Sequence, residues 1–287
     1  MSSLRRAGPQ DAAAIDAFLA RFAATSMFLR SNLAHFGTCD EATPQGTTFF
    51  LADAGAGITA VFGLTNHGYL LAQAPEASAA QWAAFRDQIA GRTLVGMTGV
   101  PDQVQMCLRA LDLADGPWQL FSDEPLYHIN IADLLSGPVP VRRATAADQP
   151  LLERWFAAYA SDVGQTAPGA PPSEATKARL ARLIDSPDLV LFEDEGTPVA
   201  MAAVNARLPD TVQIGGVFTP DGMRGNGYAR KAVAGLLQQC QAEGVTQSVL
   251  FANGEAAARA YEAIGYRLIG QYRVAHLQAP KIIGEPS

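Results

Sequence analysis

The sequence contains little cysteine, no long apolar segment and no excess of positive charge. Cys39, Cys107 and Cys240 are far apart and form no CxxC pair or zinc pattern, which favours a reducing, cytoplasmic environment. No apolar run approaches the roughly 20 residues of a membrane span, and no signal-peptide core follows the first arginines. Lys plus Arg number 21 against 28 for Asp plus Glu, which disfavours non-specific nucleic-acid binding. We therefore expect a soluble enzyme of small molecules, with no metal and no membrane or nucleic-acid partner.

A short internal repeat divides the chain into two similar halves. The 287 residues, 48% of them hydrophobic, suffice for one large or two medium domains. The letters RRA occur at 5–7 and again at 142–144, and each copy is followed four residues after its Ala by Asp and a helical apolar pattern. Before the second copy lies SGPVP, which cannot continue a helix or a central strand. We expect domains at residues 1–136 and 137–287.

Apolar spacing predicts alternating strands and helices in both halves. In the second half, periods of three and four predict helices at 148–159, 173–185, 227–244 and 254–266. Short apolar runs bounded by turn residues predict strands at 188–194, 197–208, 211–219, 247–253 and 267–277. The first half repeats a similar order between residues 47 and 134. This order predicts α/β sheets with helices on their faces.

The segment VFTPDGMRGNGYARK, residues 217–231, joins a predicted strand to a predicted helix. The first N–H groups of a helix lack intrahelical partners and, together with the helix dipole, suit a phosphate. Gly225 and Gly227 would let the backbone approach such a ligand, and basic residues surround them. The spacing alone favours a simple turn with a solvated basic rim. No GK[ST] follows, and Arg230 stands where a dinucleotide fingerprint needs its third glycine.

Two motifs in this half resemble signatures of the GCN5-related N-acetyltransferases, the GNAT family. Arg224-x-x-Gly227-x-Ala229 resembles the Arg/Gln-x-x-Gly-x-Gly/Ala loop that holds the pyrophosphate of acyl-CoA. The segment FANGEAAARAYEAIGYRLIG, residues 251–270, resembles a second signature, in which an Asn after a strand precedes a helix with Ala-x-x-x-Tyr. The resemblance covers about residues 139–278. It implies two GNAT-like domains, each a mixed, mostly antiparallel twisted sheet flanked by helices.

The resemblance also implies a reaction and the residues that serve it. The acyl donor would be acetyl-CoA, and the acetyl group would pass to a primary amine of a small molecule or protein by direct attack in a ternary complex. Tyr261 would be the acid that protonates the departing thiolate. The backbone that pairs with pantetheine and polarises the thioester would be that of Val217, Phe218 and Thr219. The remaining donor-binding residues would be Arg224, Gly225, Asn226, Gly227, Tyr228, Ala229, Arg230 and Asn253.

The sequence contains no evident general base. The strands at 211–219 and 247–253 hold no carboxylate, and Glu193, Asp194 and His276 are read as solvated strand ends or surface positions. A catalytically silent acyl-CoA-binding or sensing module therefore remains the alternative function. The acceptor and the oligomeric state, monomer or homodimer, stay open, although the acidic net charge is compatible with a cationic amine.

The first half lacks the loop that would bind a donor. After its strand at 68–74 comes PEASAAQ, which has neither the arginine nor the glycines. This predicts a degenerate N-terminal copy that does not bind coenzyme A in the usual way, and that instead closes a substrate cleft or stabilises the active domain. Its Trp82, Trp118 and His128 are candidates for lining a pocket, although core packing is the simpler interpretation for aromatic side chains.

Overall fold

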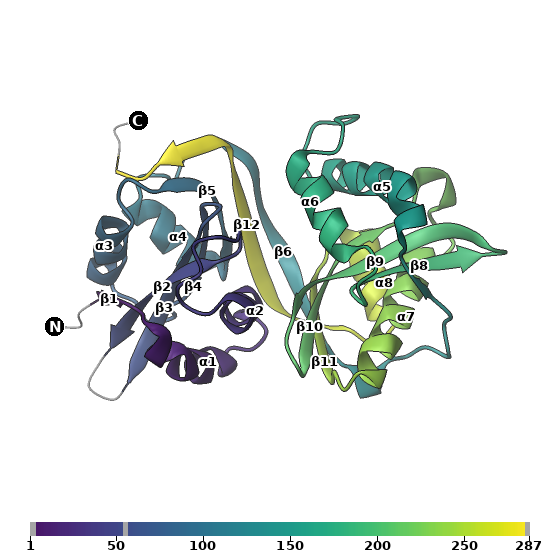
Figure 1. Ribbon diagram of the computed structural model, residues 1–287, viewed down its shortest axis with the longest axis horizontal. Coiled ribbons are helices and arrows are strands. Elements are labelled where there is room, and N and C mark those ends of the chain that lie inside the picture. The colour runs from purple at the N-terminus through teal and green to yellow at the C-terminus, as the bar shows by residue number, and fades with distance from the viewer. Residues whose placement is uncertain (1–3, 54–56, 285–287) are drawn as a thin grey trace. The chain divides into compact units, whose positions relative to one another are not determined.

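The structure is a computed structural model that describes residues 4–53 and 57–284. The chain forms two compact units, and each is described by itself. Unit 1 consists of Met1–Glu124 and Gln271–Ser287, and unit 2 of Pro125–Gly270. Two long strands, β6 (Trp118–Asn130) and β12 (Arg267–Ile282), have one part in each unit (Figure 1).

Unit 1 is a mixed sheet with helices on both faces. Its strand order is β1-β2-β3-β4-β5-β12-β6, and β4 and β5 pair in parallel, whereas the other registered pairs are antiparallel. The strands not yet bounded are β1 (Leu4–Arg6), β2 (Thr47–Asp53), β3 (Ile58–Thr65), β4 (Tyr69–Gln73) and β5 (Thr93–Gly99). The helices are η1 (Pro9–Asp11), α1 (Ala12–Ala20), α2 (Met27–Phe36), α3 (Ala79–Gln88) and α4 (Pro101–Ala110).

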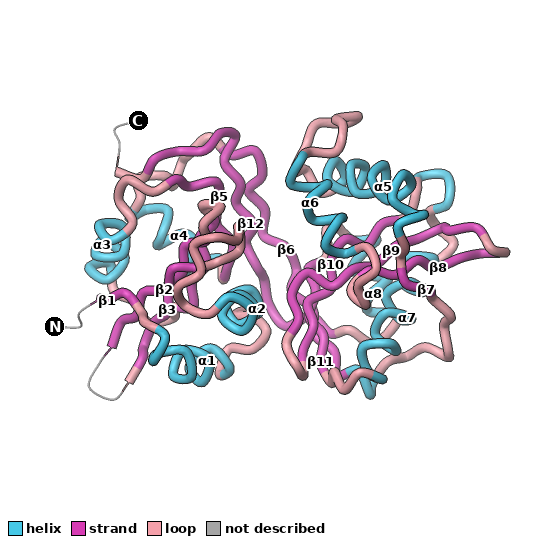
Figure 2. The backbone as a smooth tube through the Cα atoms, in the orientation of Figure 1, coloured by secondary structure: helices cyan, strands magenta, loops and turns pink. Residues whose placement is uncertain are grey.

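Unit 2 repeats this arrangement. Its strand order is β6-β11-β10-β9-β8-β7, and β10 and β11 are again a parallel pair among antiparallel ones. The strands are β7 (Arg142–Arg143), β8 (Leu189–Asp194), β9 (Thr197–Arg207), β10 (Thr211–Phe218) and β11 (Gln247–Phe251). The helices are η2 (Ile131–Asp133), η3 (Ala146–Asp148), α5 (Gln149–Asp162), α6 (Glu174–Leu183), η4 (Asp221–Met223), α7 (Tyr228–Ala242) and α8 (Glu255–Glu262) (Figure 2).

The strands bury both faces because apolar residues occupy successive positions. In β8, Leu189 and Leu191 belong to the core under α5 and α6, whereas Val190 and Phe192 belong to the core under α7 and α8. Side chains of a strand alternate between faces, so a continuous apolar run serves two helical layers. In unit 1 the run FFLA of β2 divides in the same way between the α1–α2 face and the α3–α4 face.

The Arg-Arg-Ala repeat reappears as the same ion pair in each unit. The guanidinium of Arg5 donates two hydrogen bonds to Asp11, at 2.8 and 2.9 Å, and Arg142 donates two to Asp148, at 2.7 and 2.8 Å. The Nε of each arginine donates to a carboxylate at the end of the second strand of its unit, Asp53 or Glu193. The repeat is therefore structural: a bidentate pair ties the first strand to the start of the first helix.

The predicted fold class is confirmed, but the units do not follow the predicted boundary at residue 136. Residues 125–136 group with unit 2, because the end of β6 pairs with β11 from Leu126↔Phe251 to Asn130↔Gln247. Residues 271–287 group with unit 1, because β12 pairs with β5. Strand β12 is also longer than the predicted strand at 267–277, since it continues to Ile282.

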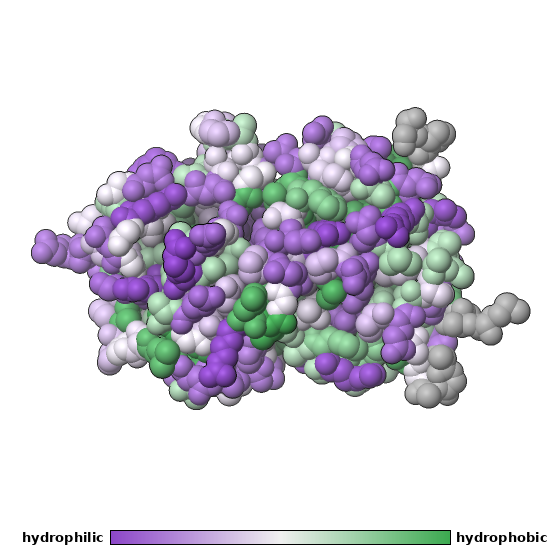
Figure 3. Space-filling view, turned by 180° about the vertical axis from the view of Figure 1, so that it is seen from behind, coloured by the Kyte–Doolittle hydropathy of each residue, from purple (hydrophilic) through white to green (hydrophobic). Residues whose placement is uncertain are grey.

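Among the described residues, no helix is long and apolar enough to cross a membrane. On the face seen in Figure 3, hydrophobic residues form small patches among hydrophilic ones. The large hydrophobic side chains that remain exposed are Phe121, Leu135, Leu268, Ile269 and Ile282.

Candidate active site

The parallel strands β10 and β11 separate where the candidate site begins. Their register runs from Thr211↔Gln247 to Ile214↔Leu250 and, in the described part of both strands, goes no further. On its other side, β10 pairs with β9 through an irregularity between Gly215 and Phe218. The β10 backbone after Ile214 thus has an edge that β11 does not cover. An extended ligand with amide groups can pair with such an edge.

The loop after β10 leads into the N-terminus of α7. Gly225 and Gly227 have φ angles of 85° and 74°, in the left-handed region that favours glycine. A Cβ added at Gly225 would meet nothing within 4 Å, so the space beside it is open. The N–H of Lys231 donates to the carbonyl of Gly227, the residue just before α7. The N–H groups of Tyr228, Ala229 and Arg230 precede that of Lys231 and have no intrahelical acceptor, which is the arrangement that binds phosphate.

Arg224 holds the loop in place. Its Nε donates to the carbonyl of Thr219 at 3.0 Å, and its Nη2 lies 2.5 Å from Asp162 Oδ2 and 2.9 Å from Asp221 Oδ1. Asp162, the last residue of α5, also accepts a hydrogen bond from the Asn253 side chain on its backbone carbonyl, at 3.1 Å. Asp162 therefore joins the end of β11 to the loop. Sequence reasoning missed it, because no local pattern marks a helix-terminal Asp that is 62 residues away from its partner.

The other predicted loop residues have different surroundings. Asn226 donates to the carbonyl of Met223 at 3.1 Å, which closes the turn. The Tyr228 hydroxyl donates to Asp194 at 2.6 Å. Arg230 and the neighbouring Lys231 are exposed, although the Lys231 ammonium lies 5.2 Å from the Phe192 ring. The Arg230 Nε lies 2.8 Å from the position that a Cβ on Gly227 would take, so a basic side chain lies beside the helix N-terminus.

The last two residues of β10 face different cores, and Thr219 follows them. Val217 packs against the α7–α8 core, whereas Phe218 is buried in the α5–α6 core with its ring 5.9 Å from that of Trp155. Thr219 is 8% exposed, and its hydroxyl has no hydrogen-bond partner among the described residues. A buried hydroxyl without a partner is unusual, and here it lies at the end of the open edge of β10.

Tyr261 lies on α8 and is 7% exposed. It belongs to the α7–α8 core, against which Val217, Met223 and Tyr228 also pack, so it is part of the layer that supports the loop. Its ring centroid is 6.0 Å from that of Tyr266, whose hydroxyl lies 2.7 Å from Ser248 Oγ. Burial raises the pKa of Tyr266 well above its usual value.

Glu193, Asp194 and His276 each have another hydrogen-bond partner, so none is assigned as the general base. Glu193 accepts from Arg142 Nε at 2.6 Å, and Asp194 accepts from Tyr228. His276 belongs to unit 1, where its Nε2 lies 3.3 Å from the Tyr69 hydroxyl and burial lowers its pKa. Glu193 and Asp194 therefore have structural bonds, contrary to the expectation of simply solvated strand ends.

In unit 1, side chains occupy the positions that correspond to the uncovered β10 edge and to the unpaired N–H groups of α7. At the end of β4, the counterpart of β10, the N–H of Ala74 donates to the buried side chain of Gln103 at 2.6 Å. At the start of α3, the counterpart of α7, Ser78 accepts from the N–H of Gln81, whose side chain accepts from the N–H of Ser78. This capping box satisfies the amides that a phosphate would need. Compared with the candidate donor-binding positions of unit 2, the first unit thus has added hydrogen bonds as well as missing glycines.

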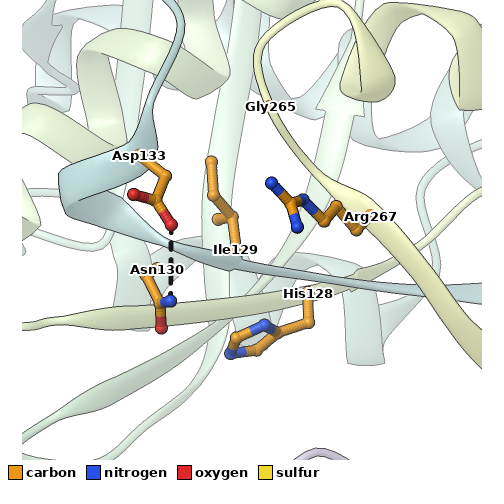
Figure 4. A pocket seen from close by; sticks show the side chains of 6 residues that line it. All are labelled: His128, Ile129, Asn130, Asp133, Gly265 and Arg267. Atoms are coloured by element: carbon orange, nitrogen blue, oxygen red, sulfur yellow. Dashed lines mark hydrogen bonds between the residues drawn. The ribbon is translucent and has the colours of Figure 1, made fainter.

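A separate pocket in unit 2 does not include any of these residues. It is lined by His128, Ile129, Asn130, Asp133, Gly265 and Arg267, and Figure 4 shows the bond from Asn130 to Asp133 across one side. His128 thus lines a pocket, whereas Trp82 is 1% exposed in the core and Trp118 packs against that core.

Comparisons with known proteins agree with this geometry. Residues 152–266 match the model of the acetyltransferase (GNAT) family. The fold matches that of a GNAT acetyltransferase from Colwellia psychrerythraea, with a TM-score of 0.53 and 16% identity over 96% of this chain and 100% of that one. It also matches a GCN5-related N-acetyltransferase from Sphaerobacter thermophilus, with a TM-score of 0.57 and 18% identity over 97% and 95% of the two chains.

A Drosophila protein has a TM-score of 0.60 and 13% identity over 96% of this chain and 99% of that one. At these identities the structures show a shared fold and nothing finer. No curated protein sequence matches the chain. Residues 152–266 therefore belong to the acetyltransferase (GNAT) family, in a chain whose two units both have a GNAT-like fold.

Proposed function

We propose that unit 2 transfers an acetyl group from acetyl-CoA to a primary amine by direct attack in a ternary complex. One observation carries the proposal: the uncovered edge of β10 leads directly into a glycine loop and the open N-terminus of α7. An edge of extended backbone suits the amides of pantetheine, and the helix N-terminus suits a pyrophosphate. Unit 1 has the same elements with both features occupied, so we expect one donor site per chain.

The residues of the site have separate roles in this proposal. The backbone of Val217, Phe218 and Thr219 binds pantetheine and donates an N–H to the thioester carbonyl as negative charge develops on it. The amides from Gly225 to Arg230 bind pyrophosphate. Arg224 holds the loop through Asp162 and Thr219, and its charge is balanced by Asp162 and Asp221. Asn253 closes the end of β11.

Acyl transfer also needs proton movements. Acetyl-CoA supplies an activated acyl group, and the amine must lose a proton as it attacks. Tyr261 donates a proton to the departing sulfur. No side chain of the described site is assigned as the base, because Glu193 and Asp194 already accept hydrogen bonds from Arg142 and Tyr228. The family match favours this transferase over a silent acyl-CoA-binding module.

Two measurements test the proposal. Calorimetry with acetyl-CoA should show saturable binding at one site per chain. A panel of primary amines should then give release of coenzyme A above the rate of hydrolysis. Binding without turnover for every amine class would support the silent module, and absence of binding would contradict both functions.

A further inference from the structure

Arg179 of α6 reaches across unit 2 to the strand that leads into the proposed acyl-transfer site. The residue after it, Leu180, is buried in the α5–α6 core, and this anchors the helix. The Arg179 guanidinium lies 5.1 Å from the ring centroid of Phe156 on α5 and donates to the side-chain oxygen of Asn205 on β9. Its Nη2 is 3.2 Å from the place that a Cβ on Gly216 of β10 would occupy. Four elements thus position one guanidinium.

This guanidinium has no counter-charge among the described residues. No carboxylate lies within 4.0 Å of it, whereas Arg142, Arg207 and Arg224 of the same unit all have carboxylate partners. Within unit 2, the other described arginines without such a partner are exposed, namely Arg154, Arg182, Arg230 and Arg267. Arg179 is half-buried, and burial lowers its pKa. A cation removed from water in this way is usually paired, so the missing anion points to a ligand.

The position of Arg179 limits which ligand can supply that anion. Gly216 immediately precedes Val217, and neighbouring Cα atoms are about 3.8 Å apart. If one ligand carries both the anion bound by Arg179 and the amine that attacks a thioester held at Val217, only a few covalent bonds can separate the two groups. The Asn205 amide lies across Gly215, where its NH₂ group can add a hydrogen bond. Helix α5 contacts both the proposed donor loop, through Asp162 and Arg224, and Arg179, through Phe156.

We propose that the acceptor is a small amine whose carboxylate carbon is two bonds from its nitrogen, as in an α-amino acid, and that Arg179, with Asn205, binds the carboxylate. The inference rests on the proposed acetyl transfer at this site. It assigns the substrate class that net charge alone did not indicate, because a protein lysine has no anion near its amine. The planar guanidinium fork can bind both carboxylate oxygens, which a lysine in its place could not do.

The test compares free amino acids with their own α-amides as acceptors of acetyl-CoA. Each pair has the same side chain and differs in the carboxylate, and kcat/KM is expressed per neutral amine because the α-amide has the less basic nitrogen. The wild type should prefer the acids in kcat/KM by at least about tenfold, since hydrogen bonds to charged groups contribute on that scale. Arg179→Gln should abolish the preference while leaving the Kd of acetyl-CoA unchanged, and Arg179→Lys should retain part of it. A thermal melt of each variant establishes that it is folded.

Arg154→Gln provides the matched control. Arg154 is exposed on α5 and donates to the carbonyl of Pro150 in its own helix, so the acid-to-amide ratio should stay at the wild-type value. Equal kcat/KM for acids and amides, or a ratio unchanged in Arg179→Gln, would overturn the inference. If acetyl-CoA binds and no amine reacts, the same pairs are titrated into the donor-loaded protein, and equal binding of acids and amides would overturn it. Failure to bind acetyl-CoA would instead contradict the proposed function and, with it, this inference.

Discussion

Gly227 begins α7 with a φ of 74°, a conformation in which a β-branched residue is strained. Gly227→Val should also push aside the Arg230 side chain, whose Nε would be 2.8 Å from the new Cβ. Both effects displace the amides that bind pyrophosphate in the proposed site. We expect acetyl-CoA affinity to fall by about 1–3 kcal/mol, the range for leaving buried polar groups unpaired. Calorimetry with acetyl-CoA measures this change.

Gly222 supplies the control for that variant. It lies in the same loop, has no left-handed φ, and a Cβ there would meet nothing within 4 Å. Gly222→Ala should bind acetyl-CoA with wild-type affinity. Equal affinity of Gly227→Val and the wild type would show that the loop amides do not hold the donor.

Tyr261 tests the chemical step. Tyr261→Phe keeps the ring that packs in the α7–α8 core and removes the hydroxyl, so acetyl-CoA affinity should stay nearly constant. We expect kcat to fall about 10²-fold with a reactive amine, the lower range for loss of a general acid. Pre-steady-state measurements of acetyl transfer distinguish this loss from slow product release.

Tyr266→Phe is the matched variant for Tyr261. It should lower the free energy of unfolding by about 1 kcal/mol through loss of the bond to Ser248, without a comparable loss of kcat. An unchanged kcat in Tyr261→Phe would make Tyr261 a packing residue, and a loss confined to acetyl-CoA affinity would make it a binding residue.

At the scale of elements, the Arg142–Asp148 pair ties β7 to the start of α5. Hydrogen bonds from Arg142 lower the pKa of Asp148 from 3.8 to about 2, and bonds from Thr145 add to the effect. Because the folded-state pKa is depressed, the stabilisation is fully present above about pH 4 and is lost as the pH falls toward 2. Asp148→Asn should cost about 1–2 kcal/mol at pH 7, after allowing for the partly exposed arginine.

Denaturant unfolding of Asp148→Asn and the wild type between pH 7 and pH 2 measures this contribution. The difference between the two proteins should shrink below pH 4. Asp11→Asn should behave alike, since hydrogen bonds from Arg5 lower the pKa of Asp11 to about 2. The exposed Asp115→Asn should show little difference at any pH. A difference for Asp148→Asn that does not depend on pH would contradict the assignment.

At the scale of the whole molecule, unit 1 contains most of β12 from the far end of the chain, and unit 2 begins within β6. A fragment of residues 137–287 would lack the end of β6 that pairs with β11, and a fragment of residues 1–136 would lack β12, which lies between β5 and β6. Removing an inner strand leaves backbone groups unpaired and opens the core. We expect neither fragment to melt cooperatively when expressed alone.

Co-expression of the two fragments is the control for this prediction. Because together they contain every strand, the mixture should recover a cooperative melt and acetyl-CoA binding. A fragment of residues 137–287 that folds alone and binds acetyl-CoA would show that the end of β6 is dispensable for unit 2.

Local sequence patterns determined the element types and the repeat. Alternating or continuous apolar runs predicted β2, β3, β8 and β9, because a strand with two covered faces needs apolar residues at both parities. The glycines at 225 and 227 predicted the loop before α7, since few other residues adopt its left-handed angles. Apolar spacing predicted the helix at 173–185, and α6 begins after Ser173, whose hydroxyl accepts from the N–H of Thr176.

Only the tertiary structure decided which distant segments meet. Three contacts join residues far apart in the chain. They are the pairing of β12 with β5, the ion pair of Asp162 with Arg224 and the approach of Arg179 to Gly216. Strand pairing and ion pairs between distant segments depend on the three-dimensional arrangement, and they produce no periodic pattern or fixed spacing in the sequence. For this reason the proposed donor loop could be predicted from its own residues, whereas the proposed Arg179 site became visible only from the tertiary arrangement of β9, β10, α5 and α6.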